Sequence, residues 1–176
     1  MSTPATANLF FSPTLNRTSL SKAWMAVLFG LAVICFESTP LMAGANTGKW
    51  LADIWPSSLG QANTPFFGLV HHLLRKSGHF TGYGTLGLLL HKAWNSSVRI
   101  YLKMVGGQLL FAASALAVSF TFLVGCMDEW HQSMIPGRVS CFSDVLIDTS
   151  GAIIFNVIFW LSRVLNRREL MKQQLA

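Results

Sequence analysis

Long apolar runs alternate with short polar breaks along this chain. The first run, 24–43, stays apolar up to Glu37 near its end, and the second, 73–94, is polar at its start and apolar afterwards. The third run, 104–127, carries no charge, and the fourth, 144–165, is most apolar in its second half. A helix needs about 20 mostly apolar residues to cross a hydrocarbon core about 30 Å thick, so all four runs predict membrane spans.

Helices fit these runs better than strands do. None of the runs alternates apolar and polar positions as a membrane β-barrel strand does, whereas a helix satisfies its backbone hydrogen bonds within one segment. We therefore predict an all-α membrane protein, a bundle of four transmembrane helices over residues 22–165. A flexible tail is predicted at 1–21, rich in Ser, Thr, Asn and Pro, and a helical C-terminal extension at 166–176.

The segment between the first two runs contains Trp50 and Trp55, with Leu51 and Ile54 between them. Indole side chains concentrate at the boundary between membrane and water, so this pattern is typical of a short interfacial helix. An ordinary loop with a few buried aromatic residues fits the pattern equally well, and the sequence leaves both interpretations open.

Composition supports the membrane class. Hydrophobic residues make up 52% of the chain and charged residues 11%, and the mean hydropathy is positive. The net charge of +6 does not indicate nucleic-acid binding, because the basic residues flank the apolar runs and form no soluble basic domain with interleaved aromatic residues.

The basic residues also predict the orientation. With a cytoplasmic N-terminus, nine of the 13 basic residues lie inside, and only four lie outside, namely Lys49, Arg75, Lys76 and Arg138. Cytoplasmic segments carry the excess of Lys and Arg in membrane proteins, so both termini are predicted to be cytoplasmic. We expect a multi-pass protein of the bacterial inner (cytoplasmic) membrane.

A cleaved signal peptide is a second interpretation of the first run. A basic stretch and an apolar run lead to an A-x-A sequence at 43–45, and cleavage there would leave three spans. The first 22 residues are long for the basic segment of a signal peptide, so retention of the span is the preferred interpretation.

The three cysteines do not make an even disulfide framework. Cys35 lies within the first span and is expected to behave as a small apolar residue. Cys126 and Cys141 share the predicted outer face, but a bridge between them needs a geometry that spacing alone does not establish.

Polar residues of the second span fall on one side of a helix. Lys76, His79 and Tyr83 stand at positions i, i+3 and i+7, which places them along a single stripe. Gly78 and Gly82, four residues apart, are predicted to let another helix approach closely.

The third run continues into a polar stretch. Asp128, Glu129 and Gln132 extend that helix on the outer side, and Pro136-Gly137 provides a chain reversal from which Arg138 emerges.

Asp144 and Asp148 stand one turn apart at the start of the fourth helix, with Gly151 on the same side. Four of the seven acidic residues of the chain thus lie within 21 positions at the membrane edge. Ionisable groups are costly there, so they should face the bundle and find partners. The predicted polar site comprises Lys76, His79, Tyr83, Asp128, Glu129, Gln132, Arg138, Asp144 and Asp148.

Each of these residues also has a purely structural interpretation. Asp144 would complement the positive end of its helix, with a preceding serine as the cap. Arg138 would hold Glu129 or Asp128 in a bidentate pair that fixes the turn. Lys76 would reach the head groups, and His79 would only hydrogen-bond a neighbouring helix. The clustering on one face favours a site.

The remaining polar residues indicate less. We expect His71, His72, His91 and His131 to be interfacial, and the role of Glu37, alone as a charge in its span, is left open.

The stretches "KSGHFTGY" and "DEWHQSMIPGRVSCFSDVLIDTSGA" together resemble the VanZ-like membrane proteins. That family has Lys, His-Phe and Tyr in one helix, then Asp-Glu-x-x-Gln, Pro-Gly-Arg and Asp-x-x-x-Asn-x-x-Gly. The matching residues are Lys76, His79-Phe80, Tyr83, Asp128-Glu129, Gln132, Pro136-Gly137-Arg138, Asp144, Asp148 and Gly151. The likeness covers 76–151, and "FESTP" at 36–40 resembles the end of the family's first helix.

Two positions depart from the family pattern. Asp148 stands where the family usually has Asn, which adds a possible negative charge. A specific ligand of the family is therefore less securely assigned to this chain. Phe155 replaces a common second Gly, so the fourth helix is expected to pack less closely. The resemblance implies membership in a family whose named member confers low-level teicoplanin resistance by an unsettled mechanism.

The leading hypothesis is a non-enzymatic envelope protein whose polar site binds a lipid or cell-wall head group. Arg138 and Lys76 would pair with phosphate, while Glu129 and Asp144 orient them. The expected partners are membrane lipids and a lipid-linked or cell-wall ligand, without nucleic acid, cofactor or metal, and the oligomeric state is left open.

Two other functions stay open. In the first, an intramembrane enzyme acts on a phospholipid or polyprenyl phosphate with His79 as nucleophile or base. The "SGH" at 77–79 resembles part of the lipid phosphatase signature "PSGH", although the other block of those enzymes has no counterpart. In the second, His79 and the four acidic residues relay protons or hold a metal, without a dedicated ligand spacing.

Overall fold

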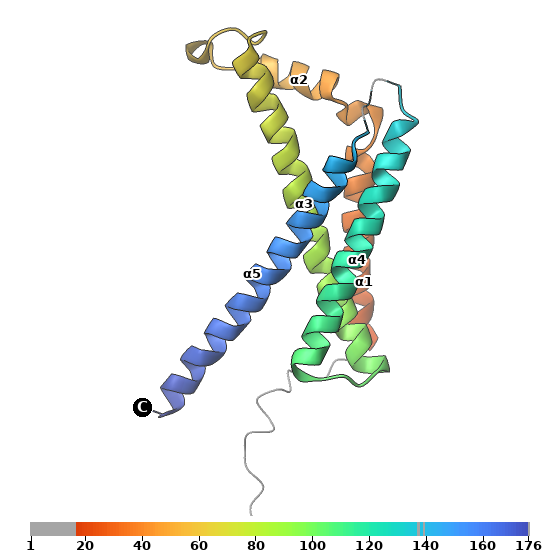
Figure 1. Ribbon diagram of the computed structural model, residues 1–176, viewed down its shortest axis with the longest axis vertical. Helices are drawn as coiled ribbons and strands as arrows, with labels where there is room; N and C mark the ends of the chain where they lie inside the picture. Colours follow the sequence, from red (N-terminus) through yellow and green to blue (C-terminus); the bar gives the residue numbers. More distant parts are fainter. Residues whose placement is uncertain (1–16, 137, 139, 176) are drawn as a thin grey trace, which may run out of the picture.

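The computed structural model describes residues 17–136, 138 and 140–175, and every regular element in these ranges is helical (Figure 1). The elements are α1 (Arg17–Glu37), η2 (Pro40–Met42), α2 (Gly44–Asp53), η3 (Ser57–Leu59), α3 (Pro65–Tyr101), α4 (Gly106–Ser133) and α5 (Phe142–Leu175), where η denotes a 3-10 helix. The all-α prediction is confirmed. Within the described part of the chain, three segments are long and apolar enough to cross a membrane: α1, α4 and residues 142–166 of α5.

α1 begins and ends earlier than the first apolar run indicated. It ends at Glu37, because Thr39 adopts the extended conformation that a following proline favours. The prediction of a helix up to residue 43 is therefore wrong. Residues 17–21, assigned from sequence to the flexible tail, are helical, and Leu20 among them is buried. The rest of that predicted tail, 1–16, lies outside the described residues.

The segment after α1 contains the short helix that was one of two interpretations. α2 covers Trp50, which is half exposed, and ends before Trp55. The Trp55 indole N–H donates to the carbonyl of Gly60 at 3.1 Å, and its ring meets that of Phe67 edge-on at 5.0 Å. The helical interpretation is correct, while its location at a membrane interface stays a prediction.

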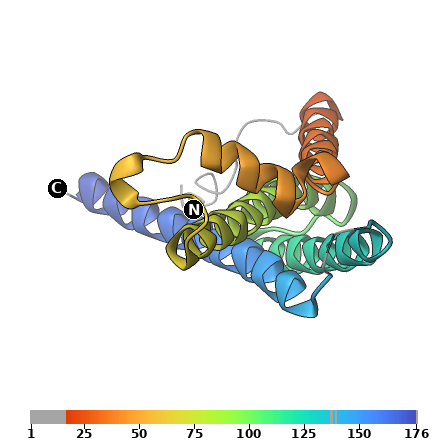
Figure 2. The same cartoon turned by 90° about the horizontal axis from the view of Figure 1, so that it is seen from above.

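α3 is much longer than the second apolar run. Its start at Pro65 is capped by the Thr64 hydroxyl, which accepts from the Phe67 amide at 3.3 Å. It continues for 37 residues to Tyr101 and is the central helix, since it packs against α1, α4 and α5. Figures 1 and 2 show α3 crossing α5.

The core of the bundle lies between α1, α3 and α4. Its fully packed members are Ala23, Val27, Ile34, Tyr83, Leu86, Leu90, Ala93 and Ala117. Trp24 of α1 meets Trp94 of α3 edge-on at 5.2 Å, and its indole N–H donates to the Ser97 hydroxyl at 3.1 Å. One aromatic pair and one hydrogen bond therefore join the start of α1 to the second half of α3.

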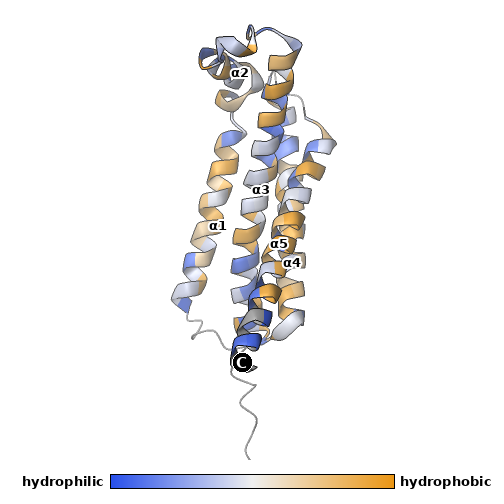
Figure 3. Cartoon of the chain, turned by 90° about the vertical axis from the view of Figure 1, so that its left-hand side faces the viewer, coloured by the Kyte–Doolittle hydropathy of each residue, from blue (hydrophilic) through white to orange (hydrophobic). Residues whose placement is uncertain are grey.

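Large apolar side chains also cover the outside of the bundle. Phe29 of α1, Phe111 of α4 and Ile158 of α5 are 72%, 77% and 58% exposed. Figure 3 shows hydrophobic residues along the length of these helices. Soluble proteins rarely expose apolar surfaces of this extent, so the outer faces are suited to contact with lipid.

The closest helix contact joins α3 and α5 through small residues. A methyl group added at Gly151 would collide with the Phe80 carbonyl oxygen, and one added at Gly87 would come within 2.8 Å of the Ala152 side chain. Gly78, by contrast, has no neighbour within 4 Å, so its predicted role in packing is wrong, because it lies on a different side of α3.

Phe155 does not loosen this contact. Its ring lies over Gly84, where an added methyl group would be 2.9 Å from the ring, and it meets the Phe80 ring edge-on at 5.9 Å. The expected looser packing of the last helix is not found, because Gly84 of the partner helix leaves the space that Phe155 fills.

All three cysteines are free thiols, so Cys126 and Cys141 form no bridge.

Candidate functional site

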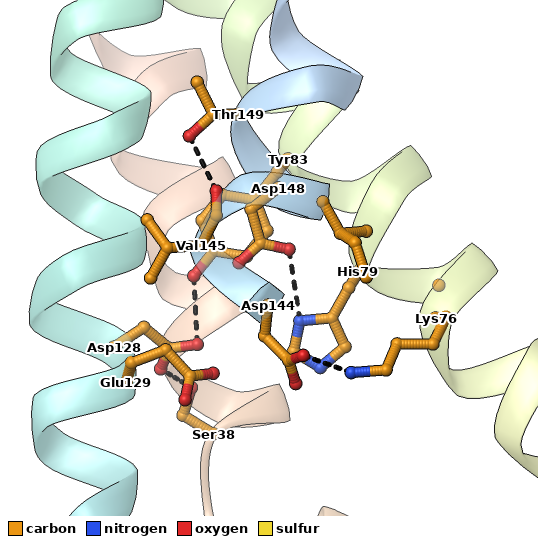
Figure 4. A network of polar contacts seen from close by, with 12 residues as sticks. Ser38, Lys76, His79, Tyr83, Asp128, Glu129, Asp144, Val145, Asp148 and Thr149 are labelled. Atoms are coloured by element: carbon orange, nitrogen blue, oxygen red, sulfur yellow. Dashed lines mark hydrogen bonds and ion pairs between the residues drawn. The ribbon is translucent and has the colours of Figure 1, made fainter. Parts of the chain in front are cut away.

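Polar side chains gather at one end of the bundle, where α1 and α4 finish and α5 begins (Figure 4). We call this the site end. The helix ends there leave backbone groups without intrahelical partners, and side chains from distant parts of the chain supply many of the missing contacts. The site-end residues form three groups: a network around Asp128, two ion pairs between α3 and α5, and the turn that carries Arg138.

Asp128 is the centre of the first group. It is buried, and its carboxylate accepts hydrogen bonds from the hydroxyl of Tyr83 at 2.9 Å and from the amide of Gln132 at 2.8 Å. The Ser38 hydroxyl donates to its other oxygen. The network thus ties the end of α1 to α3 and α4. Ser38 was not among the predicted site residues, although the "FESTP" likeness included it.

Lys76 of α3 and Asp144 of α5 form an ion pair. Their side chains are 27% and 17% exposed, so the pair is only partly open to the surroundings. The structural interpretation had Lys76 extending away from the bundle, whereas here its ammonium group is held against α5 by Asp144. Asp144 lies in the first turn of α5, where a negative charge also complements the helix dipole.

The second pair joins His79 and Asp148. The Nδ1 atom of His79 lies 3.4 Å from Oδ1 of Asp148, whose side chain is completely buried. Neither carboxylate oxygen of Asp148 has a hydrogen-bond partner within the described structure. His79 is thus the one ionisable group that this carboxylate meets at ion-pair distance among the described residues.

The turn between α4 and α5 differs from its predicted role. The Arg138 amide donates to the Ile135 carbonyl at 3.2 Å, as expected for a reversal at Pro136-Gly137. The Arg138 guanidinium, however, donates from Nη2 to the carbonyls of Glu37 and Thr39, both at 2.7 Å. The predicted bidentate pair with Glu129 or Asp128 is wrong, because the guanidinium lies over the end of α1 and binds its free carbonyl groups.

Glu129 has another partner. Its carboxylate accepts from the backbone amide of Cys141 at 2.7 Å, just before α5 begins. Glu129 therefore fixes the end of the turn and does not orient Arg138. The neighbouring Cys141 is exposed, and the hydrogen bond from the Ser143 hydroxyl to its sulfur lowers the pKa of its thiol.

A pocket of about 800 Å³ opens at the site end. Its charged and polar lining comprises His71, His72, Arg75, Lys76, His79, Gln132, Arg138, Cys141, Ser143 and Asp144. Five predicted site residues are thus brought to one cavity: Lys76, His79, Gln132, Arg138 and Asp144. The other four, Tyr83, Asp128, Glu129 and Asp148, do not line it and support the lining residues.

Five polar residues of the pocket were missed as site residues by sequence reasoning, namely His71, His72, Arg75, Cys141 and Ser143. Arg75 was used only as evidence of topology, and His71 and His72 were expected to be interfacial. Arg75 donates from Nη1 to the carbonyl of Met42 at 3.1 Å and to the hydroxyl of Thr47 at 3.3 Å. The same hydroxyl lies 2.9 Å from Nε2 of His71. The basic pair at 75–76 was the available signal.

The other two histidines lie away from the pocket. His91 is buried, with Nδ1 3.0 Å from the Ser114 hydroxyl and its ring 5.1 Å from that of Phe159. Its predicted interfacial position is wrong, because α4 and α5 cover it. His131 is exposed near the end of α4.

The pocket carries an excess of positive charge. Three cationic residues and one carboxylate line it, which corresponds to a formal charge of +2 with the histidines neutral. Within the described ranges, neither Arg75 nor Arg138 forms an ion pair with a carboxylate. Burial lowers the pKa of Arg138 from its ordinary value, and the nearby charge of Arg75 adds to the effect. The two guanidinium groups thus share one site with no carboxylate of the described residues at ion-pair distance, while the charges of Asp128 and Glu129 act on Arg138 from farther away.

The described residues contain no group of three or more His, Cys, Asp or Glu side chains placed to hold a metal ion.

Apolar outer faces, three helices suited to span a membrane and a polar pocket at one bundle end together define a helical protein of the membrane type. The chain belongs to the VanZ/LLP1 family, whose model matches residues 6–163. This match confirms the family resemblance of its motifs. Searches of curated proteins and of solved structures returned no match.

Proposed function

We propose that the pocket at the site end binds the phosphate of a lipid head group or of a lipid-linked cell-wall precursor. The observation that carries this proposal is the pair of guanidinium groups, Arg75 and Arg138, that face one cavity without a carboxylate partner in the described structure. Guanidinium groups match the oxygens of phosphate in charge and geometry. A negatively charged head group would supply the missing counter-charge.

The protein's backbone contacts make these arginines suitable receptors. Each uses one terminal nitrogen to bind carbonyl groups near the end of α1, namely Met42 for Arg75 and Glu37 and Thr39 for Arg138. These bonds hold the side chains in place without neutralising them. Ligand binding then costs less side-chain entropy than it would with free arginines.

Lys76 is the third cation of the proposed site. Asp144 holds it at the pocket wall, and an incoming phosphate would compete for the same ammonium group. A ligand must therefore displace the Asp144 carboxylate from Lys76. A doubly charged terminal phosphate competes with Asp144 better than a phosphodiester does.

The proposal places the chain in the bacterial inner membrane with α1, α3, α4 and α5 all crossing it. α3 is more polar than its neighbours, but it packs against all three of them, so its polar residues can face protein. The bias of the basic residues supports cytoplasmic termini and a site end at the outer surface. Such a pocket would meet lipid-linked precursors where the cell wall is built.

A direct binding measurement tests the proposal. Purified protein is titrated with phosphatidylcholine vesicles, with and without dioleoyl phosphatidic acid, and with soluble glycerol 3-phosphate. We expect tighter binding with phosphatidic acid, weakened about tenfold or more by Arg75→Gln, since a charge-assisted hydrogen bond contributes about 1.5–3 kcal/mol. Lys49→Gln is the matched control, because Lys49 is exposed on α2 and does not line the pocket.

Equal binding to both vesicle types, or equal losses in Arg75→Gln and Lys49→Gln, would show that no specific phosphate site exists. Binding of glycerol 3-phosphate as tightly as the lipid would assign the site to free phosphate esters and refute a lipid ligand.

The family resemblance adds teicoplanin resistance to the proposal. Wild type, Arg138→Ala and Glu129→Gln are expressed in a susceptible bacterial host at equal membrane levels, and susceptibility to teicoplanin is measured. We expect protection by wild type and its loss in both variants, because one removes a pocket cation and the other replaces the charged acceptor of the Cys141 amide with a neutral one. Absence of protection by abundant wild type would refute the resistance role.

A further inference from the structure

The proposed phosphate site uses the three cations of the pocket and does not need the His79–Asp148 pair. Asp148 lies within α5, completely buried, with its Oδ2 atom 3.7 Å from the position of an added methyl group on Gly125 of α4. Burying a carboxylate costs several kcal/mol unless a charged or hydrogen-bonding partner compensates. The compensating group within ion-pair reach is the imidazole of His79. The charge of Asp148 therefore acts on that ring.

The ring of His79 is held in one orientation. Its Nδ1 atom is buried and faces Asp148, and the ring lies parallel to that of Tyr83, with an interplanar angle of 9° and centroids 6.2 Å apart. Tyr83 is in turn fixed by its hydrogen bond to Asp128. A carboxylate beside Nδ1 favours the tautomer that carries its proton there, which leaves the lone pair on Nε2.

The free nitrogen of His79 faces the pocket. His79 is one of the lining residues, and Figure 4 shows its second ring nitrogen on the side of Lys76 and Asp144, opposite Asp148. A phosphate bound to Lys76 would therefore lie beside a basic nitrogen. Ion pairs and hydrogen bonds would be enough to bind that phosphate. The pocket contains, in addition, an oriented base.

We propose that this protein hydrolyses the terminal phosphate of its lipid ligand, with His79 as the general base and Asp148 as the residue that positions it. The inference rests on the proposed phosphate site. Nε2 of His79 takes a proton from a water molecule, and the water oxygen forms a bond to phosphorus. The bond from phosphorus to the leaving oxygen breaks on the opposite side, the leaving oxygen takes a proton from solvent water, and the imidazolium gives its proton back to solvent. The products are inorganic phosphate and the dephosphorylated lipid.

The charged groups of the pocket lining, together with Asp148, have defined parts in this step. The cations Arg75, Lys76 and Arg138 stabilise the charge on the phosphoryl oxygens, and Asp148 stabilises the imidazolium. Asp144 keeps Lys76 at the wall until the substrate replaces it. No metal ion or redox partner enters the balance.

Asp148→Asn is the decisive variant. Asn has nearly the same shape as Asp, and its amide oxygen can accept a hydrogen bond from Nδ1 of His79. It cannot stabilise a positive imidazolium by charge, however. Asp148→Asn should therefore preserve the fold and the orientation of the ring while removing the electrostatic support for proton transfer.

The test measures release of inorganic phosphate by purified protein in phosphatidylcholine vesicles that contain dioleoyl phosphatidic acid or farnesyl diphosphate. Glycerol 3-phosphate in solution forms the third arm. We expect release from at least one lipid, with one oxygen from ¹⁸O-labelled water in the phosphate. Asp148→Asn and His79→Gln should lower kcat by about 10²- to 10⁴-fold with KM and lipid binding unchanged. Thermal midpoints are compared to confirm that both variants are folded.

The outcomes separate the two proposals. Wild type that binds phosphatidic acid but releases no phosphate from either lipid would overturn hydrolysis and leave the binding function. Activity of Asp148→Asn equal to wild type would overturn the positioning role, and release from glycerol 3-phosphate alone would overturn a lipid substrate. Failure of wild type to bind any of the probes would refute both the pocket and the chemistry.

Discussion

At the scale of single residues, the carboxylates of the site end have different roles that their sequence positions do not reveal. Asp128 accepts three hydrogen bonds, Glu129 binds the backbone of the turn, and Asp148 meets only an imidazole within the described structure. Asp144 pairs with a lysine at the pocket wall. A fully hydrogen-bonded carboxylate contributes to stability, whereas one without donors is available for chemistry.

The role of Asp128 predicts a stability effect. Tyr83→Phe removes the hydroxyl that donates to Asp128 inside the bundle, so it should lower the free energy of unfolding by about 1.5–3 kcal/mol. Tyr101→Phe is the control, because that side chain is 68% exposed at the far end of α3, and it should have little effect. Thermal unfolding in one detergent compares the two. Equal midpoints for both variants would contradict the assigned hydrogen bond.

The thiol of Cys141 predicts a pH dependence. The thiolate is the reactive form, and the hydrogen bond from Ser143 lowers its pKa, so alkylation should become fast at lower pH than for an ordinary thiol. Ser143→Ala should raise that pKa and move the rise in rate to higher pH. Rates are measured against pH with a maleimide in a Cys35→Ser, Cys126→Ser background. Identical profiles would mean that Ser143 does not influence the thiol.

At the scale of elements, the crossing of α3 and α5 places both ion pairs. Lys76 and His79 lie one turn apart on α3, and their partners Asp144 and Asp148 lie one turn apart on α5. The helices approach closely enough for these pairs because Gly151 carries no side chain against the α3 backbone. The geometry of the site therefore depends on a helix contact that none of the site residues makes.

This contact predicts the effect of one methyl group. Gly151→Ala would collide with the Phe80 carbonyl, so it should destabilise the bundle by about 1–3 kcal/mol and weaken the Lys76–Asp144 pairing. Gly78→Ala is the control: Gly78 also lies on α3, but an added methyl group there has no neighbour within 4 Å. This variant should be neutral or slightly stabilising, by up to about 1 kcal/mol. Thermal midpoints and phosphatidic acid binding are measured for both. A neutral Gly151→Ala would contradict the close approach.

The element boundaries show what local patterns predict well. The apolar runs located every long helix, and the turn at Pro136 was expected from its residues alone. The predicted helix boundaries were less accurate, because α3 and α5 continue past their apolar cores into polar sequence. There, helix propensity and capping decide where the helix ends. Gly78 and Gly82 fit a packing motif by spacing, but only Gly82 has a neighbour from another helix, the Glu37 side chain of α1 at 3.7 Å from an added methyl group. Gly84, Gly87 and Gly151 make the closest contact, since spacing does not specify which helix face meets a neighbour.

At the scale of the whole molecule, the site end and the opposite end are built from different parts of the chain. The pocket and its turn lie together with α2, whereas the connection between α3 and α4 lies at the other end with the C-terminal part of α5 (Figure 1). The proposed orientation therefore makes a prediction about access from the two sides of the membrane.

Cysteine labelling measures this orientation in intact cells. In the Cys35→Ser, Cys126→Ser background, an impermeant maleimide should label Cys141 from outside, since that thiol is exposed. A Leu102→Cys variant that also lacks Cys141 should label only after the cells are permeabilised, because residue 102 follows α3 at the opposite end. The reverse pattern would overturn cytoplasmic termini.

The sequence by itself determined the helical membrane class, the family and nine of the residues that gather at the site end. These conclusions depend on the lengths of apolar runs and on motifs within short segments, which are local properties. Only the tertiary structure decided the partners: Arg138 binds Glu37 101 positions away, Ser38 binds Asp128 90 positions away, and Arg75 joins the pocket. Such contacts depend on how each helix is rotated and packed against the others, and no local pattern of residues encodes that rotation.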